Sequence, residues 1–188
     1  MVIMKKPIIL VFTTSYYPFI GGVEIALQET ARRLSGEFDF LIITARQKRN
    51  LKRREIRPEG LVIRIGGGSR IDKWIFPFIA PFYYRGFVSL VWGMDISQGA
   101  FAAALLKFFM PQIPFIFTIQ SGEGEPRIGR GRFGAINAAF RFMLSRADSV
   151  TVISGALLDW ARKYGYTGPA EVVPNGVDLQ TFSPRIEA

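Results

Sequence analysis

Two adjacent glycines, Gly21 and Gly22, stand where an apolar run gives way to a helical pattern, in the stretch YYPFIGGVEIALQETARRL. Glycine lets the backbone adopt left-handed angles and approach a ligand closely. The free N–H groups and the positive dipole end of a helix's first turn favour an anion such as phosphate. A tight turn without a ligand is the alternative, and an isolated glycine pair favours it. The dinucleotide fingerprint G-x-G-x-x-G is absent, and GGGSR at 66–70 fits no phosphate motif in full.

The chain of 188 residues contains neither histidine nor cysteine. These absences exclude Ser-His and Cys-His catalysis, a histidine–zinc centre, a thiolate metal site and a disulfide framework. Hydrophobic residues make up 49% of the chain, which indicates one folded domain with a substantial core.

A basic run carries most of the formal charge of +9: residues 46–57, RQKRNLKRREIR, hold seven Lys or Arg and one Glu. Such a run is attracted to phosphate on lipid head groups or nucleic acid, and a solvated loop without a partner is the alternative. Nucleic-acid binding is disfavoured because no helix-turn-helix, RNA-recognition or zinc module is recognisable.

Two segments invite a membrane interpretation, and neither supports it. The N-terminus has a short apolar core without a small-residue cleavage site. Residues 74–93 are interrupted by Pro77, Pro81 and Arg85. We expect a loop or surface stretch there, followed by a buried helix, rather than a membrane span.

Short apolar runs alternate with helical patterns along the whole chain. Strands are expected at 7–14, 38–45, 61–67, 94–98, 114–120, 148–154 and 170–174, and helices from Val23 to Leu34 and at 83–92, 100–110, 133–146 and 155–165. This alternation predicts an α/β fold, a Rossmann-like doubly wound parallel sheet with helices on both faces. Ligands in such folds bind beyond the carboxyl ends of the strands, which here means the loops after Thr14, Gln98, Gln120 and Ser154.

Motifs at both ends of the chain closely resemble family 4 glycosyltransferases of the GT-B architecture. The family's P-x-x-GG-x-E turn and its PNG-x-D-x-x-x-F-x-P passage between domains are both present, as Pro18, Gly21, Gly22 and Glu24, and then as Pro174, Asn175, Gly176, Val177, Asp178, Phe182 and Pro184. RADSVTVISGALLDWARKYG is similar to the family's strand and helix at that position. The resemblance implies a Rossmann-like N-terminal domain over 1–173 and an interdomain linker over 174–188 that leads to a C-terminal donor-binding domain.

The resemblance also implies the function. Family members transfer a sugar from a nucleotide-sugar donor to a glycan or lipid-linked acceptor, usually with retention and without a metal. The resemblance thus implies no metal and no cofactor, with the nucleotide-sugar as a substrate. This chain would be the acceptor-binding half, with little or no activity by itself. The alternatives are a non-catalytic membrane- or glycan-binding scaffold, or one chain of a two-chain enzyme.

By the same resemblance, individual residues receive expected roles. The amides of Gly21 and Gly22 would contact the donor diphosphate, and Asn175, Gly176 and Asp178 would belong to the linker. Gln120 stands where many relatives carry a histidine near the reacting sugar, and Gln98 stands at a second such position. Glutamine can hydrogen-bond a sugar hydroxyl but cannot titrate near neutrality, so the leaving phosphate would help to deprotonate the acceptor. The acceptor would also meet a glycine-rich loop, through Glu123, Glu125, Arg127 and Arg130.

A membrane-bound acceptor would give the basic run a purpose. Arg46, Lys48, Arg49, Lys52, Arg53, Arg54 and Arg57 would then contact an anionic membrane, together with the aromatic residues Trp74, Phe76, Phe78, Phe82, Tyr83 and Tyr84. The expected location is the cytoplasm, with peripheral attachment to the inner face of the plasma membrane as a further hypothesis.

Overall fold

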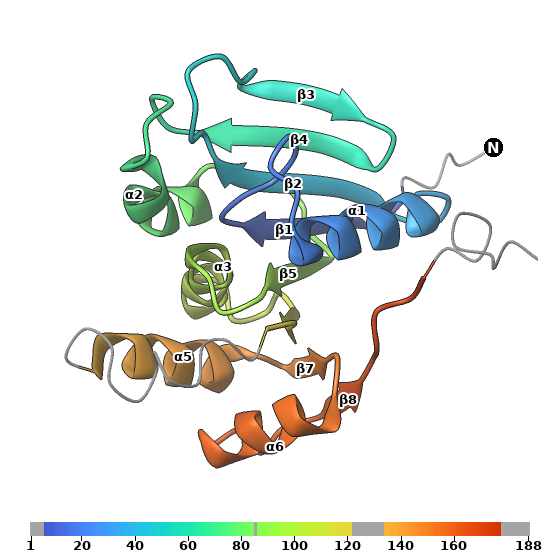
Figure 1. Cartoon of the computed structure of the whole chain (residues 1–188), viewed down its shortest axis with the longest axis vertical. Helices are drawn as coiled ribbons and strands as arrows, with labels where there is room; N and C mark the ends of the chain where they lie inside the picture. Colours follow the sequence, from blue (N-terminus) through green and yellow to red (C-terminus); the bar gives the residue numbers. More distant parts are fainter. Residues whose placement is uncertain (1–5, 85, 122–133, 178–188) are drawn as a thin grey trace, which may run out of the picture.

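A computed structural model of the chain describes residues 6–84, 86–121 and 134–177. This part of the chain forms one eight-stranded sheet in the order β3-β4-β2-β1-β5-β6-β7-β8 (Figure 1). All neighbouring strands are parallel except β3 and β4, which pair antiparallel. The strands are β1 Ile8–Thr13, β2 Asp39–Ala45, β3 Arg54–Arg57, β4 Gly60–Ile65, β5 Leu90–Met94, β6 Phe115–Ile119, β7 Ser149–Val152 and β8 Ala170–Val172.

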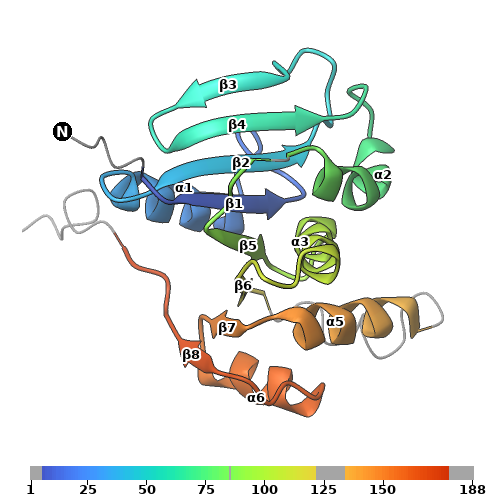
Figure 2. The same cartoon turned by 180° about the vertical axis from the view of Figure 1, so that it is seen from behind.

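Helices cover the sheet on two faces. They are α1 Gly22–Leu34, α2 Asp72–Ile79, α3 Gln98–Phe109, α5 Ala135–Arg146 and α6 Gly155–Lys163, with a short 3-10 turn η1 at Ala80–Phe82. Helix α1 lies in front of β1 in Figure 1 and behind it in Figure 2. Helices α3, α5 and α6 pack on the opposite face, where their buried side chains share one core with the sheet. The predicted doubly wound α/β fold is therefore confirmed.

Alternation along β1 shows how one strand serves both faces. Leu10 and Phe12 belong to the large core under α3 and α5. Ile9 and Val11 belong to a smaller core under α1, with Leu27 and other buried residues. Because β1 is central and parallel to both neighbours, all these side chains are buried, as expected of a continuously apolar strand.

The chain reverses its direction across the sheet at β1, which lies between β2 and β5. The first crossover passes through α1 to β2, and the later connection from β4 returns across the sheet to β5. The carboxyl ends of β1 and β5 therefore flank the point where ligands of doubly wound sheets bind.

Several local predictions were wrong. The loop expected at the start of 74–93 is helical, because α2 and η1 occupy 72–82. The helix expected at 83–92 is not found, because the described residues between η1 and β5 are not helical. The strand expected at 94–98 is instead β5, over Leu90–Met94, where an apolar segment pairs with β1 and β6. The basic run is not wholly a loop, because its last residues form β3. In the described part of the chain, no helix is long and apolar enough to cross a bilayer.

Candidate functional site

The loop after β1 brings the start of α1 to the carboxyl edge of the sheet. Gly21 is the N-cap residue and has extended backbone angles, φ −142° and ψ 174°, and no side chain caps the helix. The first hydrogen bond of the helix joins the Ile25 N–H to the Gly21 carbonyl over 3.0 Å. Helix geometry thus leaves the N–H groups of Gly22, Val23 and Glu24 without an acceptor inside the helix. Such a turn can bind an anion.

Gly21 and Gly22 differ in how much room surrounds their Cα atoms. A Cβ placed on Gly22 would meet nothing within 4 Å, whereas a Cβ on Gly21 would lie 2.5 Å from the Glu24 carboxylate. The Glu24 side chain therefore folds over Gly21 and supplies a negative charge near the helix start, where the helix dipole favours one. Only Gly22 of the pair offers open space for a ligand.

Gly22 opens into a groove of about 970 Å³ that runs along α1. One wall is α1, the floor is the adjacent surface of β1, β5, β6 and β7, and the other wall is the segment 173–177, which follows β8. Gln120, Asn175 and Gly176 line the same groove. The structure thus brings together Gly22, expected to bind the diphosphate, Gln120, expected near the reacting sugar, and two residues of the expected linker, although these three segments are far apart along the chain.

Gln120 follows β6 and reaches the far wall of the groove. Its Nε2 lies 3.5 Å from the Asn175 Oδ1, at the outer limit of a hydrogen bond. Its Oε1 is buried and has no hydrogen-bond partner among the described residues. A buried carbonyl oxygen without a donor is costly, so a rotation of the Gln120 side chain that pairs this oxygen with a hydroxyl or amide in the groove would be favourable.

The groove floor carries a short polar ladder across three strands. The Trp92 Nε1 donates to the Thr118 Oγ1 over 2.8 Å. The Thr118 Oγ1 and the Thr151 Oγ1 lie 2.6 Å apart and share a hydrogen bond. This floor combines an indole face with hydroxyl groups, a surface that suits a ligand with both apolar and hydroxylated parts.

Asp95 is a site residue that the sequence reasoning missed. It directly follows β5 and has a positive φ of 55°, an uncommon conformation outside glycine. Its carboxylate accepts hydrogen bonds from the Ser121 N–H over 3.1 Å and from the Ser121 hydroxyl over 2.9 Å. Asp95 thereby ties the exit of β6, where Gln120 lies, to the exit of β5. An acidic residue directly after a buried strand at the switch point was the signal that could have revealed it.

Gln98 takes part in a structural contact next to the groove. The Thr14 hydroxyl donates to the Gln98 Oε1 over 3.1 Å and accepts from the Gly99 N–H over 3.0 Å. A Cβ on Gly99 would lie 2.5 Å from the Thr13 Cα, so the start of α3 packs directly on the end of β1. Gln98 therefore joins the loop after β1 to α3, and it is not among the described residues that line the groove.

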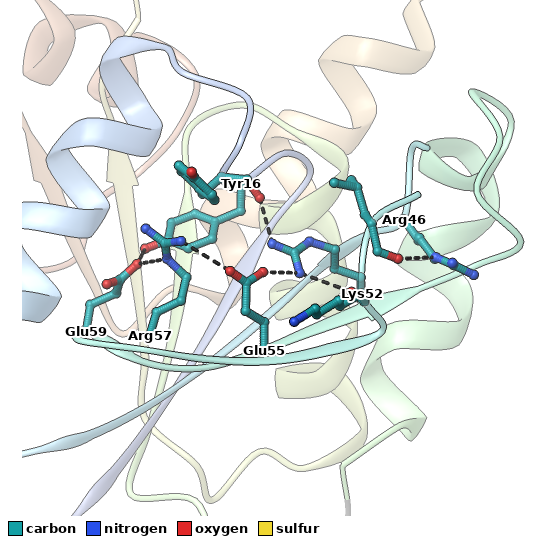
Figure 3. Close-up of polar contacts among 9 residues, drawn as sticks. Tyr16, Arg46, Lys52, Glu55, Arg57 and Glu59 are labelled. Atoms are coloured by element: carbon teal, nitrogen blue, oxygen red, sulfur yellow. Dashed lines mark hydrogen bonds and ion pairs between the residues drawn. The ribbon is translucent and has the colours of Figure 1, made fainter. Parts of the chain in front are cut away.

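A buried ionic network fixes the same loop from the other side (Figure 3). The Tyr16 hydroxyl donates to the Glu59 Oε1 over 2.7 Å, and the Arg57 Nε donates to the same oxygen over 2.7 Å. Glu55 pairs with Arg57 and with Arg64, at 3.2 and 2.8 Å. Burial, reinforced by the hydrogen bond to Glu59, raises the pKa of Tyr16, so the tyrosine stays protonated as the donor.

The basic run is divided between this network and solvent. Arg57 lies inside the network, and the Arg46 guanidinium donates to the Leu51 carbonyl over 2.9 Å. The other five basic side chains of the run, Lys48, Arg49, Lys52, Arg53 and Arg54, belong to exposed residues. Within the described residues, no three His, Cys, Asp or Glu side chains gather as metal ligands.

Comparison with known proteins identifies the family. The sequence pattern of Glycosyltransferase Family 4 matches residues 20–181. The chain belongs to this family. No curated protein sequence matches it significantly.

Solved structures agree with the fold of this family 4 domain. A sucrose-phosphate synthase from Thermosynechococcus elongatus matches with a TM-score of 0.71 and 16% identity, over 96% of this chain and 50% of that chain. A second structure of the same synthase matches with a TM-score of 0.62 and 15% identity, over 94% of this chain and 92% of that chain. The family 4 domain is thus an N-terminal domain of the GT-B architecture, and it spans half the length of the first synthase structure.

Several predicted residues of the family 4 domain cannot be placed. Glu123, Glu125, Arg127 and Arg130, expected to bind the acceptor, lie outside the described residues, and so does Asp178 of the linker. Their roles stay predictions.

Proposed function

We propose that this family 4 domain is the acceptor-side half of a glycosyltransferase that uses a nucleotide-sugar donor, retains the anomeric configuration and needs no metal ion. The observation that carries the proposal is the open first turn of α1 at Gly22, which faces the same groove as Gln120, Asn175 and Gly176. A second domain would deliver the donor to this edge of the sheet.

In this proposal the Gly22 end of α1 binds the departing diphosphate. Negative charge develops on the diphosphate as the glycosidic bond breaks, and fixed N–H donors stabilise it without reorganising. The Glu24 carboxylate occupies the space beside Gly21, so the diphosphate meets the helix at Gly22. The unpartnered Oε1 of Gln120 then accepts a hydrogen bond from a hydroxyl of the sugar or acceptor.

The experiment compares two glycines that occupy the same helical position. Gly22 begins α1 and Gly155 begins α6, and a Cβ on either would meet nothing within 4 Å. A screen of the complete gene product with nucleotide-sugars and acceptors first identifies a substrate pair. Gly22→Val keeps the backbone N–H group but places an isopropyl group in the open space that the diphosphate would occupy. It should therefore lower kcat by about 10²–10³-fold, the effect expected when an oxyanion is kept from a donor, while Gly155→Val stays within about threefold of wild type.

Wild-type turnover by Gly22→Val would disprove the diphosphate role. The isolated chain of 188 residues should show little or no turnover with the same substrates. Robust transfer by the isolated chain would show that no second domain is needed.

We further propose that the domain attaches to an anionic membrane through an aromatic surface formed by α2, η1 and the end of α3. Exposed large apolar side chains concentrate there: Trp74, Ile75, Phe78, Ile79, Phe82, Tyr83, Phe108 and Phe109. Ring contacts join Phe82 to Phe109 and Phe109 to Phe108, with centroids 5.2 Å apart in both pairs. Phe76, which we expected to share this role, is buried.

Cations border this aromatic surface. The Arg146 guanidinium lies 4.9 Å from the Phe108 ring centroid, and the Lys73 ammonium lies 5.4 Å from that of Trp74. The basic run is adjacent, because Gly68, just before α2, packs against the backbone of Arg49. Aromatic rings at the head-group level, with cations beside them, suit a surface of anionic phospholipid.

Liposome flotation tests the attachment. Vesicles with anionic lipid should carry the protein at low salt, and Phe78→Ser with Phe82→Ser should abolish flotation. Val172→Ser is the matched control, because Val172 is 40% exposed on β8, at the opposite edge of the sheet from the basic run. Absence of wild-type binding at low salt, or an equal loss in the control, would rule out this surface as the attachment site.

A further inference from the structure

We propose that the ionic network of Glu55, Arg57, Glu59 and Arg64 is a positioning device for catalysis, which sets the place of the Gly22 amide by holding the turn at Tyr16 and Tyr17. This inference rests on the proposed role of Gly22 in binding the diphosphate. The network lies on the β3–β4 hairpin, and its side chains meet Tyr16 (Figure 3).

Three contacts hold the turn in place, and they are made by its two consecutive residues, Tyr16 and Tyr17. Tyr16 is 2% exposed, and its hydroxyl donates to the Glu59 Oε1. The Tyr17 carbonyl accepts a hydrogen bond of 2.7 Å from the Arg64 Nη2. The Arg57 guanidinium lies 3.8 Å from the centroid of the Tyr17 ring, within the range of a cation–π contact. Side chain and backbone of the turn are therefore both fixed.

The inward orientation of charge on β3 indicates a purpose beyond stability. On this edge strand, Ile56 is 88% exposed while its neighbours Glu55 and Arg57 point into the network. An edge strand that served only to cover the core would place the isoleucine inside. Two glutamates and two arginines balance in charge, yet well-packed apolar side chains would in general be at least as stable. What apolar side chains could not supply is directional contact with the Tyr17 carbonyl.

The start of the loop is clamped as firmly as its middle. The Thr14 carbonyl accepts hydrogen bonds from the Thr44 hydroxyl and the Gln47 Nε2, each of 3.1 Å. The Gln47 Nε2 also donates to the Ser15 Oγ over 2.7 Å. Only four residues, 18–21, separate Tyr17 from Gly22. A shift of the Tyr16–Tyr17 turn therefore moves the start of α1. A displacement of about 1 Å at a reacting centre can cost about 10²-fold in rate.

Tyr16→Phe is the main test, because it removes one hydroxyl and leaves the packing in place. In the complete gene product, kcat should fall by about 10–100-fold while the KM for the acceptor changes less than about threefold. Hydrogen exchange at the amides of residues 22–24 should become faster. Tyr166→Phe is the matched control: Tyr166 is 5% exposed, and its hydroxyl donates to the Pro169 carbonyl over 2.7 Å, away from the loop.

A merely structural role would lower the melting temperature of both tyrosine variants and leave kcat, measured well below that temperature, unchanged. That result, or an equal loss of kcat in Tyr166→Phe, would overturn the inference. If Gly22→Val loses turnover while Tyr16→Phe keeps it, the positioning inference alone fails. If Gly22→Val keeps turnover, the proposed role of Gly22 fails, and the positioning inference, which rests on it, fails as well. Arg64→Lys keeps the charge but not the planar fork, and it should fall between wild type and Tyr16→Phe in kcat.

Discussion

On its two sides, helix α1 borders two parts of the sheet surface that differ. One part is covered by apolar side chains, and the other is left as an open groove. Toward β2 and β4, the sheet surface is closed by apolar side chains such as Phe40, Ile42 and Val62. The buried ionic network lies beyond them, at the end of that region. Toward β5, β6 and β7, the same surface is left as a groove whose floor is Trp92, Thr118 and Thr151.

This difference separates two tasks. The closed side contains strong, directed contacts, which fix the loop that leads to Gly22, although the Glu59 Oε2 and the Arg64 Nε there have no hydrogen-bond partner among the described residues. The open side contains hydroxyl groups and a partly unpaired glutamine, which leave hydrogen-bonding capacity for a ligand or another part of the protein. A site needs both, because a ligand gains most from a groove whose walls are already in place.

The largest expected effect is on the closed side. Arg64→Met should destabilise the chain by about 2–3 kcal/mol, because Glu55 loses the shorter of its two ion pairs and the Tyr17 carbonyl loses a charged donor. Arg54→Met on the same hairpin is the control and should change stability by less than about 0.5 kcal/mol, since Arg54 is exposed. Urea unfolding followed by circular dichroism measures both. Equal effects would show that the network adds nothing to the closed side.

On the open side we expect a smaller effect. Thr118→Val should cost about 1–2 kcal/mol, because the half-buried Trp92 loses the acceptor of its Nε1 and the Thr151 hydroxyl loses its partner. A double-mutant cycle with Trp92→Phe isolates the indole–hydroxyl contact, and a coupling near 1 kcal/mol is expected from urea unfolding of the four proteins. No coupling would indicate that water replaces the lost partner and that the floor is wetter than the closed side.

The smallest effect concerns pH. Burial opposes ionisation of Glu55, but the hydrogen bonds and charges of Arg64 and Arg57 outweigh it and lower the pKa of Glu55. A carboxyl with a lowered folded-state pKa contributes stability above its unfolded pKa, and this contribution is lost as the pH falls through the folded value. Between about pH 5 and about pH 3, wild type should therefore lose more stability than Glu55→Gln. Parallel pH profiles from urea unfolding would contradict this.

Much of the fold was predictable because its signals are local. The run IILVFT of β1 is continuously apolar, and the helix after Gly22 has a buried stripe that includes Leu27 and Ala31. The glycine pair at the helix start is equally a feature of neighbouring residues. The wrong helix at 83–92 shows the limit of such signals: the segment that became β5 is short and apolar, and periodicity does not separate a buried strand from a buried helix.

The site was less predictable because its contacts join distant segments. Gln120 was expected at the site and Asn175 in the linker, but the groove that they share with Gly22 exists only once β6, β8 and α1 are assembled. In the sequence, Arg57 is one of seven similar basic residues of the run. Its pairing with Glu59, which also accepts a hydrogen bond from Tyr16, became visible only in the folded β3–β4 hairpin. Asp95 gained its role from Ser121, a residue of another loop.

The sequence alone determined the alternation of strands and helices, the family and the glycines at the first helix, since each depends on residues that are close together along the chain. Tertiary structure decided which glycine is open, which arginines are buried and where the groove lies. Those outcomes depend on burial and on charges brought together across the sheet, and neither can be read from spacing along the chain.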